Sequence, residues 1–210
     1  MKINREEIYE TLKKRNGEDV FNKLLNSSVA VCGLGGLGSN IAIALARAGV
    51  GKLIITDFDK VDISNLNRQQ YGISKIGEFK TKALKDILMD INPYIDLELH
   101  TEKITRENAY EILKDADVIC EAFDNAENKA MLLDVVSEKM SGKYYVGASG
   151  MAGLHDPNSI QTKKLTSRIY ICGDFESGIE NETLYSSGAM LCASHQAHNI
   201  LMILTEQIDK

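Results

Sequence analysis

The sequence predicts an α/β fold with a doubly wound, mostly parallel sheet, antiparallel strands toward the C-terminus and a C-terminal helix. Short apolar runs alternate along the chain with segments whose apolar residues recur at helical spacing. A glycine-rich turn joins the first apolar run to the helix that follows it, and the 210 residues include 16 glycines but only 2 prolines. This alternation is typical of Rossmann-like sheets, in which helices cover both faces.

The N-terminal segment is polar and has the pattern of a helix. The pattern covers residues 6–25, and Asn16 and Gly17 interrupt it. We therefore expect an N-terminal helical extension over residues 1–27, packed on the outside of a single nucleotide-binding domain over residues 28–210. No linker-like stretch divides the remainder, and its length suits one α/β domain.

A strand-helix-strand unit follows the extension. Residues 28–32 form a short apolar run of the kind expected for a strand buried on both faces. Glycines come next, and residues 39–48 predict an apolar helix that ends at Gly49. A second buried strand is predicted over residues 52–56, closed by Asp57. Together these segments predict a βαβ unit.

The middle of the chain continues the alternation. Residues 64–76 are polar and irregular, whereas residues 80–91 place apolar side chains on one helical face until Asn92 and Pro93 end the helix. The spacing of Ile95, Leu97 and Leu99 predicts a strand. Beyond it we expect a helix over 105–114, a strand over 118–122, a helix over 126–140 and a strand over 144–148.

The pattern changes after Ser149. Residues 159–162 and 167–172 alternate like antiparallel strands, and residues 173–187 have the composition of a loop. A helix from about residue 188 to 208 closes the chain. Its expected buried side chains are Leu191, Ala197, Ile200, Leu201 and Leu204.

Charge and hydropathy narrow the classes of function. Lysine and arginine number 24 and aspartate and glutamate 30, which gives a net charge of −6 and a pI near 5.3. This balance supplies no broad basic surface, so we expect no nucleic-acid partner. The N-terminus is too polar for a signal peptide, and the apolar runs are too short to span a bilayer. We expect a cytoplasmic protein without a membrane partner.

Cysteine and histidine spacing does not indicate a metal site. Cys32 and Cys120 are far apart in sequence, and no Cys-x-x-Cys pair occurs, so we expect reduced thiols and no zinc. Cys172 ends an apolar strand and Cys192 lies in an apolar helix, so both are expected to be buried. A helical spacing of three residues separates His195 from His198, and we interpret this pair as a polar stripe.

A phosphate-binding loop is predicted where the first strand meets its helix. The residues Gly33, Gly35, Gly36 and Gly38 match the G-x-G-x-x-G pattern, whose backbone N–H groups converge on a phosphate. Asp57 comes 19 residues later, at the end of the second strand, where a carboxylate can accept hydrogen bonds from ribose. The pattern indicates an adenosine nucleotide, but does not itself distinguish NAD from ATP.

Three charged residues favour ATP over NAD. ATP carries more negative charge, and breaking its phosphate chain requires cations at the oxygens and a carboxylate to hold Mg²⁺. Arg68 follows the second strand, Lys80 begins a helix, and Asp124 comes at the carboxyl end of the fourth strand. Each alone would be an ordinary surface charge, but together they form the set that ATP chemistry needs.

The motifs, taken in order, resemble those of a known family. They are Gly33-Leu-Gly-Gly-Leu-Gly-Ser39, Asp57-Phe-Asp59, Ser64-Asn-Leu-Asn-Arg-Gln69, Gly77-x-x-Lys80, Ile91-Asn-Pro93 and Asp124-Asn125. In this order and spacing the chain resembles the ThiF/MoeB/HesA family of adenylyltransferases, which are relatives of ubiquitin-activating enzymes. The resemblance is strong over residues 28–148. The short length and the His195-Gln-Ala197 helix look most like the short ThiF-like subgroup associated with thiamine biosynthesis.

The resemblance implies a role for each motif residue. The four loop glycines would contact the nucleotide, Asp57 would hold the ribose, and Asp59 would lie near Mg²⁺ or the phosphates. Arg68, Lys80 and Asp124 would be the catalytic residues: Lys80 would neutralise charge at the α-phosphorus, and Asp124 would coordinate Mg²⁺. The further residues implied to bind the nucleotide are Ser64, Asn65, Leu66, Asn67 and Asn125.

The implied reaction joins the C-terminal Gly-Gly carboxylate of a small ubiquitin-like sulfur carrier protein to the α-phosphate of ATP. Products are an acyl-adenylate and pyrophosphate. A terminal carboxylate is ionised at neutral pH, so no general base is required. The resemblance also implies a homodimer. An N-terminal arginine that reaches a partner's site has one candidate here, Arg15.

Three other functions stay open on sequence grounds. The chain could activate a small-molecule or tRNA-linked carboxylate, as a dehydratase-like relative would. It could instead be a noncatalytic scaffold that binds nucleotide and carrier, although its retention of Arg68, Lys80 and Asp124 argues against this. A NAD-dependent dehydrogenase would have no use for that charged set.

Overall fold

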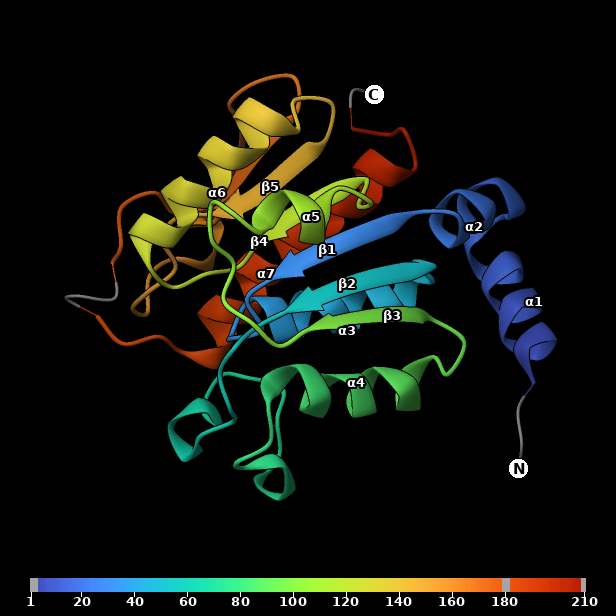
Figure 1. Ribbon diagram of the computed structural model, residues 1–210, viewed down its shortest axis with the longest axis horizontal. Helices are drawn as coiled ribbons and strands as arrows, with labels where there is room; N and C mark the ends of the chain where they lie inside the picture. Colours follow the sequence, from blue (N-terminus) through green and yellow to red (C-terminus); the bar gives the residue numbers. More distant parts are fainter. Residues whose placement is uncertain (1–3, 179–181, 209–210) are drawn as a thin grey trace.

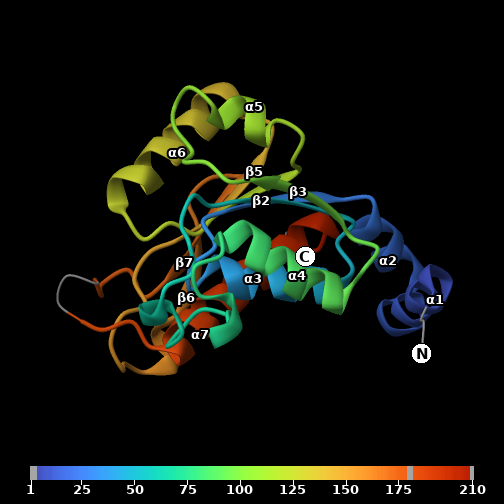
Figure 2. The ribbon, with the colours of Figure 1, turned by 60° about the horizontal axis from the view of Figure 1, so that its bottom comes forward.

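A seven-stranded sheet lies between two layers of helices in the computed structural model, which describes residues 4–178 and 182–208 (Figures 1 and 2). The strands are β1 (Ser28–Cys32), β2 (Lys52–Thr56), β3 (Asp96–His100), β4 (Val118–Glu121), β5 (Tyr144–Ala148), β6 (Gln161–Lys164) and β7 (Ile169–Gly173). The helices are α1 (Arg5–Asn16), α2 (Glu18–Leu25), α3 (Gly38–Ala48), α4 (Lys80–Ile91), α5 (Ala109–Leu113), α6 (Ala126–Lys139) and α7 (Ser186–Leu204). The predicted α/β class is confirmed.

The strand order is β3-β2-β1-β4-β5-β7-β6. All neighbours are parallel except β6, which runs antiparallel to β7 and ends the sheet. The chain builds outward from β1 in one direction through β2 and β3, then crosses back to β4 on the other side. The carboxyl ends of β1 and β4 therefore form a topological switch point, where open α/β sheets bind their ligands.

Alternating side chains divide the core between the two faces of the sheet. In β1, Val29 and Val31 pack in the cluster that contains residues of α3, α4 and α7, whereas Ala30 and Cys32 pack in the cluster that contains residues of α5 and α6. Figure 2 shows these two helical layers on opposite sides of the sheet. Because both faces are covered, the inner strands β1, β2, β4 and β5 are mostly apolar and buried, whereas the edge strand β3 alternates polar and apolar residues.

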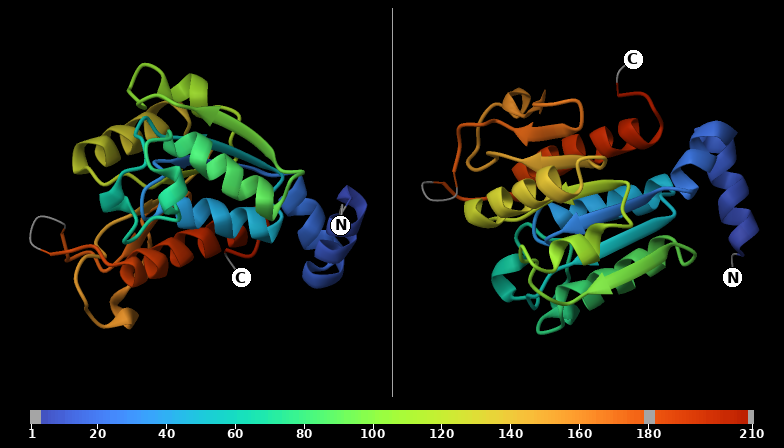
Figure 3. Two further views of the ribbon diagram at one scale, coloured as in Figure 1. Left: turned by 90° about the horizontal axis from the view of Figure 1, so that it is seen from below. Right: turned by 45° about the horizontal axis from the view of Figure 1, so that its top comes forward.

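The N-terminal helices lie at the amino end of the sheet, at the edge opposite the switch point (Figures 1 and 3). Helix α1 buries no residue and is capped by Asn4 and Glu7. Helix α2 buries Phe21 and Leu24, and Leu24 belongs to the main core cluster. These contacts agree with an external position for α1, and the domain boundary at residue 27 stays a prediction.

Several predicted elements differ from the structure in extent. The helix predicted over 105–114 is shorter, because the Asn108 side chain accepts a hydrogen bond from Thr105 N and holds residues 105–108 in a turn. The strand predicted over 118–122 ends at Glu121. The irregular segment at 64–76 is confirmed, and it contains a short 3₁₀ turn, Ile73–Lys75.

The C-terminal half shows similar shifts. A 3₁₀ turn at Pro157–Ser159 delays the first antiparallel strand, and Thr166 accepts backbone hydrogen bonds that delay the second. Helix α7 ends before left-handed Glu206. The prediction that Leu191 is buried is wrong, because its side chain is 39% exposed. Helix α7 is apolar around most of its surface, so periodicity does not identify its buried face.

No helix in the described part of the chain has the length and apolar character needed to cross a membrane.

Candidate functional site

The candidate site lies at the carboxyl edge of the sheet, around the loop that joins β1 to α3. Gly33 has a φ of +92°, and a Cβ there would lie 2.8 Å from the Ala122 carbonyl oxygen. A Cβ on Gly38 would lie 1.8 Å from the Gly33 carbonyl oxygen. Glycine is therefore required at both positions for the loop to close against the end of β4.

Gly35 and Gly36 have a different environment. A Cβ on Gly35 would meet only Gln69, and one on Gly36 would make ordinary contacts with Arg68 and Ala189. These two glycines are not required by internal packing. Their bare backbone leaves room for a ligand to approach the loop N–H groups, as a phosphate does in glycine-rich loops.

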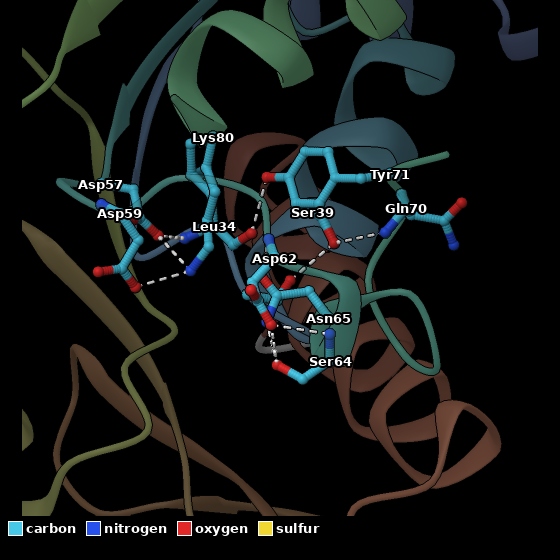
Figure 4. A network of polar contacts seen from close by, with 11 residues as sticks. Leu34, Ser39, Asp57, Asp59, Asp62, Ser64, Asn65, Gln70, Tyr71 and Lys80 are labelled. Atoms are coloured by element: carbon cyan, nitrogen blue, oxygen red, sulfur yellow. Dashed lines mark hydrogen bonds and ion pairs between the residues drawn. The ribbon is translucent and has the colours of Figure 1, made fainter. Parts of the chain in front are cut away.

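Asp57 fixes the glycine loop from the neighbouring strand (Figure 4). One of its carboxylate oxygens accepts a hydrogen bond from Leu34 N at 2.7 Å and the other accepts from Asp59 N at 2.8 Å. Its burial raises the pKa of the Asp57 carboxyl, and the charge of Lys80 opposes that rise. Tyr71 donates its hydroxyl to Leu34 O at 2.8 Å, which holds the other side of the same residue.

Lys80 begins α4 and is only 6% exposed. Its Nζ lies 2.8 Å from Asp59 Oδ2 and 3.7 Å from Asp57 Oδ2. The backbone N–H of Lys80 also donates to Asp59 O at 2.9 Å, which fixes the start of α4 beside the end of β2. The structure thus brings Lys80, Asp57 and Asp59 together, as Figure 4 shows.

Arg68 lies beside the glycine loop, where a Cβ on Gly36 would lie 3.4 Å from its Cγ. Its guanidinium donates to Ser64 O at 3.1 Å and to Asn67 Oδ1 at 2.8 Å, so Ser64 and Asn67 orient it. Ser39 joins this segment to the loop by donating to Gly35 O and accepting from Gln70 N. Arg68 and the glycine loop are therefore side by side.

Two other predicted residues of this segment have structural roles. Asn65 accepts a hydrogen bond from Asp62 N at 3.1 Å and completes the capping of the 3₁₀ turn Ile63–Asn65. Leu66 is half-buried and packs against the main core, so it anchors the segment rather than offering a polar contact.

Asp124 lies three residues beyond the end of β4, and its side chain is exposed. Within the described residues it makes no hydrogen bond or ion pair. Asn125 accepts from Asn128 N at 3.1 Å and caps α6. No group of three or more metal-binding side chains occurs in the described residues. An Mg²⁺ ion would fit here through the Asp124 carboxylate and phosphate oxygens, the combination in which it is commonly bound.

The sequence did not reveal the best-buried charged residue at this edge, Glu121. It is 1% exposed, and Lys129 Nζ lies 2.8 Å from its Oε1. Burial raises the pKa of the Glu121 carboxyl, and Lys129 opposes that rise. A charged residue at the end of an apolar strand indicates that a partner lies nearby, but the sequence does not show which residue supplies it. Gln196 of α7 donates to Glu121 O at 2.8 Å, and the sequence gives no signal for this contact between distant segments either.

Outside this edge, the histidines of α7 do not form a metal site. His195 lies 3.3 Å from the Thr162 hydroxyl, and His198 is exposed. Arg15 is exposed on α1, at the opposite end of the sheet from the glycine loop. Neither feature adds a residue to the site within one chain.

All four cysteines are free and buried, as Cys172 and Cys192 were predicted to be. Burial raises the pKa of Cys172 to about 11 and raises the pKa of the other three thiols as well.

We expect a thiol-specific reagent at pH 8 to label the native protein at least about 1000-fold more slowly than the unfolded protein, because the reagent reaches a buried thiol only when the protein unfolds around it. Mass spectrometry over time measures this. Rapid labelling of any one cysteine in the native protein would contradict it.

The fold and this edge define a doubly wound α/β protein with a glycine loop of the phosphate-binding type at its switch point. The chain belongs to the ThiF family, since the model of that family matches residues 9–209.

Curated relatives match part of the chain. "Probable adenylyltransferase/sulfurtransferase MoeZ" of Mycobacterium tuberculosis is 38% identical over 134 residues, which cover 63% of this chain and 34% of MoeZ. "Adenylyltransferase and sulfurtransferase UBA4" of Kluyveromyces lactis is 39% identical over 130 residues, 61% of this chain and 29% of UBA4. The chain thus matches about a third of the length of these relatives.

Solved structures match most or all of the chain. The Escherichia coli tRNA N6-threonylcarbamoyladenosine dehydratase TcdA, in complex with ATP, has a TM-score of 0.87 at 19% identity and covers 100% of this chain and 99% of its own. E. coli MccB with AMPCPP and MccA has a TM-score of 0.71 at 20% identity, over 91% of this chain and 60% of its own. At these identities the matches establish a shared fold.

Proposed function

We propose that this chain is an ATP-dependent adenylyltransferase that activates the C-terminal carboxylate of a small ubiquitin-like carrier protein. The observation that carries the proposal is the set of charges around the glycine loop. Arg68 lies against Gly36, Lys80 is buried beside Asp57, and Asp124 offers a carboxylate with no partner in the described residues. Membership of the ThiF family supports it.

This charge arrangement suits a triphosphate better than a dinucleotide. Arg68 would contact the phosphate chain and Lys80 the α-phosphate, while Asp124 would hold Mg²⁺ against the phosphate oxygens. The Mg²⁺ would supply charge neutralisation on the phosphates. Asp57 and Asp59 hold the Lys80 ammonium in place beside the end of β2.

The reaction transfers an adenylyl group. A carboxylate oxygen of the carrier forms a bond to the α-phosphorus, and the bond from that phosphorus to the oxygen bridging the α- and β-phosphates breaks. Pyrophosphate leaves with that oxygen, and the carrier becomes an acyl-adenylate. The attacking carboxylate is already ionised, so the residues need only position the reactants and stabilise charge.

In its finer form the proposal names a ThiS-like sulfur carrier of thiamine biosynthesis, a cytoplasmic location and a homodimer. The resemblance of the motifs and the adenylyltransferase and sulfurtransferase names of the curated relatives support the sulfur carrier. The resemblance of the motifs also supports the homodimer, in which Arg15, exposed on α1, would reach the nucleotide of the second copy.

Pyrophosphate exchange into ATP tests the proposal. Exchange is expected with a carrier that ends in Gly-Gly and is expected to vanish when the last glycine is deleted from that carrier. ATP binding without exchange for any carrier would instead indicate a scaffold. Preference for NAD over ATP in calorimetry would overturn both readings.

The alternative substrate is a tRNA-linked carboxylate. The TcdA match over nearly the full length of both chains brings this candidate forward. The net charge of −6 argues against it, because tRNA binding draws on a basic surface. ATP consumption that depends on N6-threonylcarbamoyladenosine-containing tRNA, with no response to any carrier, would favour it.

A further inference from the structure

Glu121 is a fully buried carboxylate whose contacts reach three other parts of the protein. Its Oε1 accepts from Phe123 N at 2.6 Å and lies 2.8 Å from Lys129 Nζ. Its Oε2 lies 3.1 Å from the same Nζ and accepts from Ala148 N at 3.4 Å. One side chain thus joins the end of β4 to α6 and to the end of β5.

The surrounding structure is shaped to hold this carboxylate. A Cβ on Gly147 would lie 2.8 Å from Tyr145 Cε1, 3.1 Å from Ile171 Cδ1 and 3.2 Å from Glu121 Oε2, so the carboxylate is one of three side chains that pack closely against this glycine. Lys129 is 25% exposed, and its side chain reaches inward to the buried acid. A buried ion pair of this kind is weak evidence for stability, because burying both charges costs about as much as their attraction returns. Its position suggests another role.

The pair encloses the turn between β4 and α6 (residues 121–125). At the start of the turn, Glu121 holds Phe123 N, and Ala122 N donates to Cys32 O at 2.8 Å. At its end, Asn125 caps α6, and Lys129 N donates to Asn125 O at 3.1 Å. The Lys129 side chain in turn contacts the Glu121 carboxylate, so this ion pair joins the two ends of the turn.

Asp124 is the exposed acidic residue within this turn, at the carboxyl edge of the sheet. It follows Phe123, the residue held by Glu121, and precedes Asn125, the cap of the helix that carries Lys129. No contact of its own side chain fixes it within the described residues. The Glu121–Lys129 pair therefore fixes the turn on one side of Asp124, and the Asn125 cap fixes it on the other.

We propose that Glu121 and Lys129 are positioning residues that hold Asp124 where its carboxylate meets a phosphate-bound divalent cation. This inference rests on the proposed function, because it assigns Asp124 to the cation of the ATP complex. Groups that orient a metal ligand commonly change metal affinity by about 10- to 100-fold when they are removed.

Calorimetry of ATP binding, with Mg²⁺ and with EDTA, tests this without relying on turnover. Glu121→Gln is expected to reduce the gain in ATP affinity that Mg²⁺ provides by about tenfold or more, with metal-free ATP binding unchanged. Asp124→Asn is expected to lose the same gain. The variant that combines Glu121→Gln with Asp124→Asn is expected to lose no more than Asp124→Asn alone, because both substitutions act through the Asp124 carboxylate. Lys129→Arg, which keeps the charge, is expected to retain most of the gain.

Two further variants control for the loss of a charge on α6 and for a failure of Glu121→Gln to fold. Glu138→Gln changes an exposed carboxylate on α6 that pairs with Arg106 and should leave the Mg²⁺ gain unaltered. Where Glu121→Gln does not fold, Glu121→Gln with Lys129→Met removes both charges and gives the same comparison. Thermal denaturation verifies that each variant is folded at the temperature of the titration.

The outcomes separate the inference from the proposed function. A folded Glu121→Gln variant with the full Mg²⁺ gain, beside an Asp124→Asn variant that has lost it, would overturn the positioning role alone. A full Mg²⁺ gain in Asp124→Asn would overturn the assignment of Asp124 and the inference with it. Failure of the unmodified protein to bind ATP would overturn the proposed function and, with it, the inference.

Discussion

Replacing Lys80 or Asp124 with alanine is expected to reduce adenylate formation by at least about 100-fold in each variant. Among the described residues, Lys80 is the one cation buried beside Asp57, the carboxylate that holds the glycine loop. Asp124 is the exposed carboxylate at the end of β4 that can take a cation shared with phosphate. Pyrophosphate exchange with the carrier, measured at saturating ATP, gives the rate.

The two substitutions differ in their expected effect on folding. Replacing an exposed charge would leave the fold intact, but Lys80 is buried. Its loss leaves the buried Asp57 carboxylate without a cation, which should lower the free energy of unfolding by about 3 kcal/mol. Asp124→Ala removes a side chain with no partner in the described residues and should change it by less than about 0.5 kcal/mol.

Matched controls come from helix α4. Lys82 and Asp90 are exposed there, and Lys82→Ala and Asp90→Ala should retain full exchange activity and near-normal stability in urea. Full activity of both Lys80→Ala and Asp124→Ala would show that the residue assignments are wrong. A Lys80→Ala variant as stable as the unmodified protein would show that the buried contact with Asp57 contributes little.

The second large effect is expected from Gly38→Ala. The added Cβ would lie 1.8 Å from the Gly33 carbonyl oxygen, which is a backbone atom that no side-chain rotation can move away, so the glycine loop must move. We expect the free energy of unfolding to fall by about 3 kcal/mol, which is at the upper end of the usual cost of overpacking. ATP binding should also be lost, because the loop N–H groups would no longer converge. Urea denaturation and calorimetry measure the two effects.

Gly72→Ala is the control for this substitution. Gly72 has a φ of −94°, and a Cβ there would meet nothing within 4 Å. Alanine should therefore be tolerated and should stabilise the protein slightly, by about 0.5 kcal/mol, through the unfolded chain. Equal behaviour of the two variants would refute the role given to the Gly33–Gly38 contact.

Local patterns were sufficient for much of the fold. The strands at 28–32, 52–56 and 144–148 and the helix at 80–91 match their predicted bounds, because the apolar runs there are followed by Gly33, Asp57, Ser149-Gly150 and Asn92-Pro93. Patterns failed for α7, where apolar residues on most sides left the exposure of Leu191 undetermined. Periodicity locates a buried face only when the opposite face is polar.

The site was predicted less completely, for a physical reason. The glycines, Arg68, Lys80 and Asp124 follow strand ends, so their gathering at one edge follows from the parallel sheet. The ion pair of Lys80 with Asp59 and that of Glu121 with Lys129 join separate elements. Such pairings depend on packing between elements, which no local pattern encodes.

The burial of every native thiol makes this protein convenient for optical measurements. All four cysteines lie inside the described structure, so one cysteine introduced at an exposed position such as Asp90 would be the sole fast-reacting attachment point for a dye. A fluorophore at the far end of α4 would then report docking of a dye-bearing candidate partner by energy transfer. No prior removal of native cysteines, with its attendant loss of packing, would be needed.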